Sequence, residues 1–426
     1  MYIYNMSFTT DSEKLMKSFV DDFDKFSIKK KATVQKQTDK ILKGFYKDIR
    51  SCDLYVKTLS RRLFLNNNVH GIKTRNDIPK TPLMGSGYIP DNIKLYIEET
   101  AVGYFKMTTW VNGKIKLNIY FLMFLKSDFN RLKKIEEMLE EALKIIRFCS
   151  LYIKKNSMDS LNVYLYLTKI KKELPKSQIS ILGTTHCNSA VTFACQEKGE
   201  ILVFREEEWK KVLIHELCHS MCLDFSGLDY KSLRSDIKSL YDIKSDFEIS
   251  EAYSEFWATI IHCCFCSYSL LDSKEDLETY LLFTQFCIQF EKIFSLFQCV
   301  KMLNHMGLRY TNLIDNDDVS TTFKKVLYKE ETNVFPYYVL KCVLLFNSDK
   351  FLKWCMQNNP NIVNFDKNPV TLKKFGKFIK SNYDDKKMIK MIKDMEVLYL
   401  GMRGSYVKPN KGFVTKTTRM TICELL

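Results

Sequence analysis

The stretch that decides the fold is GEILVFREEEWKKVLIHELCHSMCLDF, residues 199–225. Its first residues, GEILVF, predict a strand, and the acidic run REEE suits the first turn of a helix. The apolar residues of KKVLI lead that helix directly into HELCH, residues 215–219. The sequence therefore predicts a helix that leaves a sheet and carries two histidines.

His215 and His219 are four residues apart, so a helix places both imidazoles on one face, where they can bind one metal ion. Glu216 lies beside the first histidine, where its carboxylate can reach a metal-bound water without binding the metal. Two histidine ligands with a glutamate as general base make the H-E-x-x-H pattern of zinc peptidases. We predict one zinc ion per chain, with Glu216 catalytic. The alternative is a pair of histidines that binds no metal.

A catalytic zinc ion needs a third protein ligand and an open position for water. The segment ISEAYSEFWATIIHCC, residues 249–264, predicts a second helix with Glu251 and Glu255 one turn apart. We expect Glu251 to bind the metal and Glu255 to hydrogen-bond the far nitrogen of a ligand histidine. The alternative is that both acidic residues only stabilise the beginning of the helix.

Three residues near these motifs are weaker candidates. His262 lies on the same stripe as Glu251 and Glu255, but within an apolar run, which favours a histidine packed in the core. Cys222 lies one turn after His219 on the same helix face, and we expect it to pack in the core. Asp224 comes where the helix should end, so we expect it to cap the helix or lie at the surface.

The rest of the chain predicts an α+β fold with large helical regions on both sides of a mixed segment. The Asn112-Gly113 pair between two β-rich runs, residues 94–110 and 114–124, is the best hairpin signal. Four later pieces are strand-like: 162–170, 177–183, 188–195 and 199–204. We expect residues 1–80 to form a helical region, 81–230 an α/β subdomain ending in the H-E-x-x-H helix, 231–400 a helical subdomain carrying the third ligand, and 401–426 an extended or partly disordered tail.

Composition places limits on the partners and the compartment. The 426 residues carry a net charge of +15, mostly from lysines in amphipathic stretches, which favours solvated helix faces over a surface for nucleic acid or membrane. The longest uncharged apolar run, residues 257–271, is shorter than the roughly 20 residues that cross a bilayer. No secretory signal precedes the fourteen cysteines, which predicts reduced core thiols and a cytoplasmic, non-secreted protein.

HELCH followed by Glu251-x-x-x-Glu255 resembles the gluzincin metallopeptidases. The resemblance implies a zincin-like core, in which a small mixed sheet with an edge strand adjoins the active-site helix. It implies metal binding by His215, His219 and Glu251, and it places Asn188, Ser189 and Ala190 on an edge strand that pairs with the substrate backbone. It also implies an oxyanion-stabilising residue downstream, for which His305 is the candidate, although His305 could equally be packed in the core.

Residues 184–262 also resemble the H-E-x-x-H peptidases encoded by large nucleocytoplasmic DNA viruses. This resemblance implies a viral zinc peptidase of the host cytoplasm or the virion, acting on a peptide or protein substrate. Two alternatives stay open. One is a catalytically inactive virion or assembly protein with the same fold and a basic surface that contacts virion proteins. The other is a core protein that binds nucleic acid through its lysine-rich faces.

Overall fold

The computed structural model describes residues 7–27, 32–64, 69–154, 157–404 and 411–425. The fold is mixed α+β, as the sequence predicts, with large helical regions. The chain forms two compact units. The sheet unit comprises Gly44–Lys171 and Asn188–Gly227, and the helical unit comprises Met1–Lys43, Lys172–Cys187 and Leu228–Leu426.

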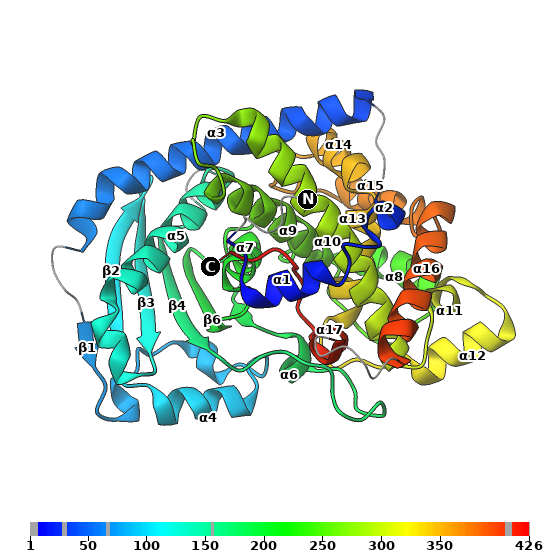
Figure 1. The fold of residues 1–426 in the computed structure, drawn as a ribbon, viewed down its shortest axis with the longest axis horizontal. Helices are drawn as coiled ribbons and strands as arrows, with labels where there is room; N and C mark the ends of the chain where they lie inside the picture. The colour runs from blue at the N-terminus through cyan, green and yellow to red at the C-terminus, as the bar shows by residue number, and fades with distance from the viewer. Residues whose placement is uncertain (1–6, 28–31, 65–68, 155–156, 405–410, 426) are drawn as a thin grey trace. The chain divides into compact units, whose positions relative to one another are not determined.

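The sheet unit contains a six-stranded sheet in the order β1-β2-β3-β4-β6-β5 (Figure 1). Strands β3, β4 and β6 are parallel, and the other neighbouring pairs are antiparallel. β5 is therefore an edge strand. The strands are β1 Val69–Gly71, β2 Gly103–Val111, β3 Ile115–Met123, β4 Ser160–Thr168, β5 Ala190–Thr192 and β6 Lys198–Arg205.

The predicted hairpin is confirmed by the pairing of β2 with β3. Asn112 and Gly113 both have positive φ, 56° and 64°, which is the conformation of a two-residue turn whose twist matches that of the strands. The β-rich reading began too early, because residues 94–100 belong to helix α4, Asp91–Thr100. Ile93 and Ile97 are buried one turn apart on that helix, while Leu95, which would share their face in a strand, is 50% exposed.

The piece 177–183, which the sequence predicts as strand-like, forms no strand. Ser177 and Ser180 close a turn through a backbone hydrogen bond of 3.2 Å, and Ile179 is 92% exposed, so its apolar side chain contributes nothing to a core. Leu182 alone makes a single bridge, to Glu330. Apolar character in this segment thus reflects a surface loop.

Helices cover both faces of the sheet. α5 and α7 pack against one face and against each other, while α4 packs its buried isoleucines on the other face with Tyr164 and Leu202. The second half of α3 covers α5, where Phe45 contacts Phe148 with ring centroids 5.7 Å apart. The helical segments are α3 Ala32–Leu63, which continues into the helical unit, η2 Arg75–Asp77, η3 Pro82–Gly85, η4 Lys126–Asn130, α5 Leu132–Ser150 and α7 Trp209–Ser220.

The helical unit is built around α9, Ser250–Ser269, and α10, Leu277–His305, which pack along each other. The apolar run at 257–271 lies mainly in α9 and is buried, as expected from its length. The other helices are α1 Thr10–Lys17, α2 Phe23–Phe26, α6 Thr184–Cys187, α8 Lys231–Tyr241, α11 Tyr310–Ile314, α12 Asp318–Leu327, the π-helix η5 Phe335–Leu340, α13 Lys341–Phe346, α14 Ser348–Asn358, α15 Pro369–Lys380, α16 Lys386–Gly404 and α17 Lys411–Lys416.

The expected disorder of the tail is wrong for its described part. Residues 417–423 are all buried in the helical unit, and Thr9 donates a backbone hydrogen bond of 2.8 Å to Glu424. Lys411–Lys416 form helix α17, and the residues after it follow an irregular path that buried polar side chains hold in place. Residues 405–410 lie outside the described part of the chain.

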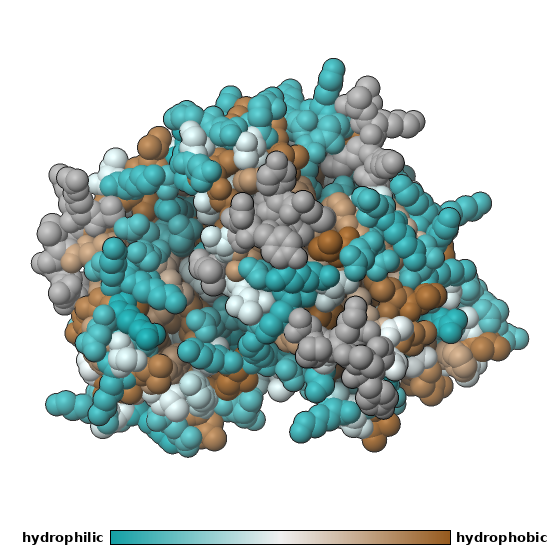
Figure 2. All heavy atoms as spheres, viewed as in Figure 1, coloured by the Kyte–Doolittle hydropathy of each residue, from teal (hydrophilic) through white to brown (hydrophobic). Residues whose placement is uncertain are grey.

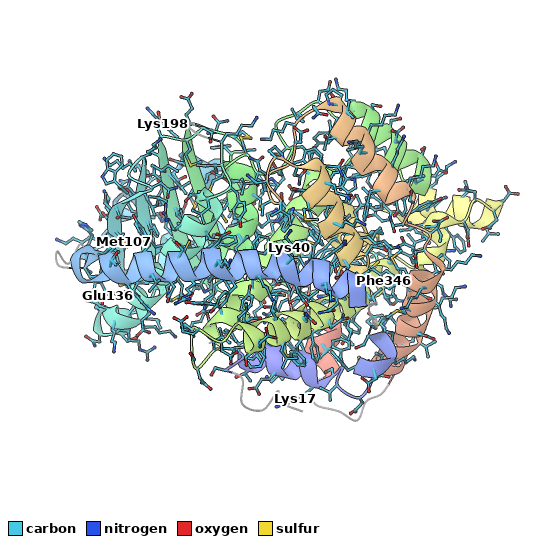
Figure 3. All side chains as sticks on the ribbon, turned by 90° about the horizontal axis from the view of Figure 1, so that it is seen from above. Lys17, Lys40, Met107, Glu136, Lys198 and Phe346 are labelled. Atoms are coloured by element: carbon cyan, nitrogen blue, oxygen red, sulfur yellow. A yellow bond between two sulfur atoms is a disulfide. The ribbon has the colours of Figure 1, made fainter. Side chains whose placement is uncertain are left out.

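The lysine excess is mostly at the surface. Lys17, Lys40 and Lys198 are exposed (Figure 3), and hydrophilic side chains dominate the face drawn in Figure 2. Six lysines are nevertheless buried: Lys172, Lys211, Lys292, Lys301, Lys324 and Lys341. Of these, Lys292 and Lys341 form ion pairs with acids, and Lys301 and Lys324 donate to carbonyl groups. Within the described residues, no helix combines the length and the apolar composition needed to cross a membrane.

Candidate metal centre

The turn from β6 into α7 places HELCH beside the sheet. β6 ends at Arg205, and Glu208 adopts a left-handed conformation, φ 63°, that redirects the chain into the helix. Leu213, Ile214 and Leu217 are fully buried. α7 packs against β5, β6 and α5, and this packing fixes the direction in which its histidines point.

The two histidines converge as their spacing predicts. Nε2 of His215 lies 3.0 Å from Nε2 of His219, and both side chains are buried, at 6% exposure. One zinc ion could sit about 2.0–2.1 Å from both nitrogens, the usual Zn–N distance. At 3.0 Å the two nitrogens can share a hydrogen bond, and a metal ion between them would replace that bond with two metal–nitrogen bonds. The pair therefore fits a metal ion that binds through Nε2.

Asp224 fixes the orientation of His219. Its Oδ2 accepts a hydrogen bond of 2.5 Å from Nδ1 of His219, and its Oδ1 accepts from the backbone and hydroxyl of Ser226 at 3.2 and 2.8 Å. The carboxylate is fully buried, so the expected helix cap or surface contact is wrong. Burial raises the pKa of Asp224, but the charge and hydrogen bond of His219 and the hydrogen bonds of Ser226 outweigh it and hold that pKa below its usual range.

A disulfide closes the loop that carries Asp224. Cys195, which follows β5, is bonded to Cys222, which follows α7, and both residues have positive φ, 56° and 55°. The backbone nitrogens of both cysteines donate to the carbonyl of His219 at 3.1 Å. The expectation of packing for Cys222, and of reduced thiols throughout, is therefore wrong for this pair. The other twelve cysteines form no disulfide and are buried.

Glu216 lies between the two histidines in sequence and is buried at 7% exposure. In the same unit, Asn188, Ser189 and Ala190 lead into the edge strand β5. Ser189 accepts a hydrogen bond of 2.9 Å from Phe204, and Ala190 pairs with Val203. The three residues predicted to bind substrate therefore lie at the beginning of an edge strand, while their role and the catalytic role of Glu216 stay predictions.

The acidic pair of α9 belongs to the helical unit. Glu251 lies in the first turn of α9 and is half-buried. Glu255, one turn later, forms an ion pair of 3.0 Å with Lys341, which also donates to the carbonyl of Met420 at 2.6 Å. The roles expected for Glu251 as a ligand and for Glu255 toward a ligand histidine stay predictions.

The other two histidines named from the sequence have backbone partners. Nε2 of His262 lies 2.6 Å from the carbonyl oxygen of Cys423, which makes it a satisfied core histidine as expected. His305 is the last residue of α10, and its Nε2 lies 2.9 Å from the carbonyl oxygen of Ser180. This contact fits the packing alternative for His305, whose role toward an oxyanion stays a prediction.

Sequence reasoning missed Asp224 and Cys195 as parts of this centre. An aspartate five residues after the second histidine is a weak signal, because its use depends on how the loop turns back after α7. The positive φ of Cys222, at a residue other than glycine, makes that turn. Comparison of the chain with protein-family models, with curated proteins and with solved structures finds no match.

Proposed function

We propose that this protein is a zinc-dependent peptidase with a zincin-like core. The observation that carries the proposal is the 3.0 Å approach of the two buried Nε2 atoms on α7. The buried Asp224, which holds the far nitrogen of His219, adds the support that metal-binding histidines usually have. A buried histidine pair that served only packing would not need both nitrogens turned to one point.

The proposed donor set is the one that the sequence predicts, His215, His219 and Glu251; two imidazoles and a carboxylate suit zinc with one position left for water. Zinc bound there would supply a water of lowered pKa and a Lewis acid for the carbonyl. Other divalent ions accept the same donors, so the choice of zinc rests on the H-E-x-x-H pattern.

Three parts of the chain have proposed roles in peptide hydrolysis. Glu216 accepts the proton of the attacking water and passes it to the leaving amine, and its burial keeps competing water away from that proton. The edge strand β5 offers unpaired backbone groups to an extended peptide, which would add to the sheet as a further strand. His305 is the proposed partner of the oxyanion. With these roles, we propose that the substrate is a peptide or a protein.

The test is metal analysis by mass spectrometry of the intact protein beside three variants. We expect Glu251→Ala and His219→Ala each to lose one equivalent of zinc relative to the wild type. Glu278→Ala is the matched control, because Glu278 is an exposed acid in the first turn of α10. An unchanged metal content in both variants, with the fold intact, would contradict the proposal and favour the inactive assembly protein.

A second test separates binding from catalysis. Glu216→Gln should keep the metal and abolish cleavage of an unstructured protein substrate such as casein, because the amide cannot accept the proton. Retained cleavage by this variant would remove Glu216 from the mechanism.

A further inference from the structure

The buried tail of the helical unit ends in a second group of metal-binding side chains. Side chains from α9, α10, η5 and α13 bind the backbone of residues 414–423. These side chains are His262, Glu291, Gln298, Lys301, Tyr338 and Lys341. The end of the tail is thus buried in the interior, and Cys423 lies in the core with it.

The carboxylate of Glu291, on α10, binds the backbone near the end of this segment. Its Oε1 accepts hydrogen bonds of 2.9 Å from the backbone nitrogens of Ile422 and Cys423, and another from the hydroxyl of Thr421. Its Oε2 is enclosed and has no hydrogen-bond partner among the described residues. An enclosed carboxylate oxygen without a partner costs free energy, and a bound ion is one of the few things that offset that cost.

Two thiols lie beside this carboxylate. Cys263 of α9, Cys423 of the tail and Glu291 of α10 each offer a ligand atom, and these three atoms lie within 4.8 Å of one another. All three residues are buried. They come from three separate segments of the chain, as the ligands of structural metal sites commonly do.

We propose that Cys263, Cys423 and Glu291 bind a second divalent ion of the zinc class, independent of the one assigned to HELCH. Two thiolates and one carboxylate select a soft or borderline ion over magnesium or calcium. The sulfur of Cys423 also lies 3.8 Å from the carbonyl of Cys287. Water or this carbonyl oxygen would be left to complete the coordination of the ion.

Metal binding at this site would exchange thiol protons for the ion. Each thiol gives up one proton as the ion enters, so one divalent ion replaces two protons and the net charge of this region does not change. Burial raises the pKa of Glu291, while the charge of Lys341 and the hydrogen bonds of the tail lower it.

The consequence is structural. An ion shared by Cys263, Glu291 and Cys423 would fasten the tail to α9 and α10, and α9 is the helix that carries Glu251. The site has no exposed donor, which suits an ion bound during folding and retained afterwards.

The test uses cobalt, supplied during expression because the site is enclosed. Thiolate ligands give cobalt a charge-transfer absorption in the near ultraviolet, whereas the HELCH donors include no thiolate. We expect this absorption in the wild type and in His219→Ala, and its loss in Cys263→Ser and Cys423→Ser. Cys264→Ser is the matched control, because Cys264 is also buried, is the next residue on α9 and lies against Tyr280.

Zinc-loaded His219→Ala, examined by X-ray absorption, provides a second measurement that needs no cysteine variant. Sulfur atoms at the Zn–S distance of about 2.3 Å would support the site. Folded protein without thiolate absorption, or a disulfide between Cys263 and Cys423, would overturn it. The His219→Ala variant has no HELCH metal site, so zinc–sulfur bonds in it report on the second site alone. Failure of the proposed function and failure of the second site are therefore distinguishable.

Discussion

Nδ1 of His219 donates to Oδ2 of Asp224 at 2.5 Å, and this bond leaves Nε2 of the same ring turned toward His215. Asp224→Asn should therefore weaken metal binding about 10- to 100-fold without removing a ligand, because the amide holds the ring less well. Competition with a chromogenic chelator measures the change. Asp229→Asn is the control, since Asp229 lies exposed in the same loop. Equal affinity in both variants would show that Asp224 does not position His219.

The disulfide can be tested by counting the cysteines that react with a thiol reagent. Unfolded protein that has never met a reductant should react with a thiol reagent at twelve cysteines, and at all fourteen after reduction. The bond closes a loop across 27 positions, so its reduction should lower the free energy of unfolding by about 2–4 kcal/mol. Cys195→Ser should show the lower stability already, and reductant should not lower it further. Fourteen reactive thiols at the outset would rule out the bond.

The local parts of the site could be read from the sequence. The i, i+4 spacing of His215 and His219 requires only that the segment be helical, and the Asn112-Gly113 turn depends on the conformational preferences of two residues. The strand that begins at Ala190 was also found, because a short apolar run flanked by polar residues is a local pattern; its place at the edge was implied only by the resemblance.

What the sequence could not show depends on contacts between distant residues. Asp224 reaches His219 only because the loop turns at Cys222, a residue with no preference for positive φ. The tail has no hydrophobic period, since side chains up to about 160 positions away, such as that of His262, satisfy its backbone. The piece at 177–183 has strand-like composition but no neighbouring strand to complete a ladder.

Lys341 and Glu255 form a buried ion pair, with each side chain 3% exposed. Lys341→Met should lower the free energy of unfolding by about 3–5 kcal/mol, because it leaves the carboxylate of Glu255 buried without its cation. Adding Glu255→Leu should recover much of that loss, since two apolar side chains need no partner. Urea unfolding of Lys341→Met, of Glu255→Leu and of the double variant gives the coupling free energy between the two side chains. Additive losses would mean that the pair contributes nothing as a pair.

Glu330 gives the stability of the helical unit a defined pH dependence. Burial raises the pKa of its carboxyl from 4.5 to about 8, despite hydrogen bonds from the backbones of Phe335 and Val334 and from Tyr328. The folded protein therefore keeps a proton that the unfolded chain releases above its lower pKa. The stabilisation is complete below pH 4.5 and is lost as the pH rises through about 8.

Glu330→Gln should flatten this slope, because the amide keeps a neutral, hydrogen-bonding side chain at every pH. Urea unfolding at about pH 5 and about pH 9 should then show a smaller difference in the variant than in the wild type. Glu331→Gln is the matched control, since it removes the neighbouring carboxyl and should leave the slope in place. If Glu331→Gln flattened the slope and Glu330→Gln did not, the proton would belong to Glu331. In that case the enclosure of Glu330 would not account for the loss of stability at alkaline pH.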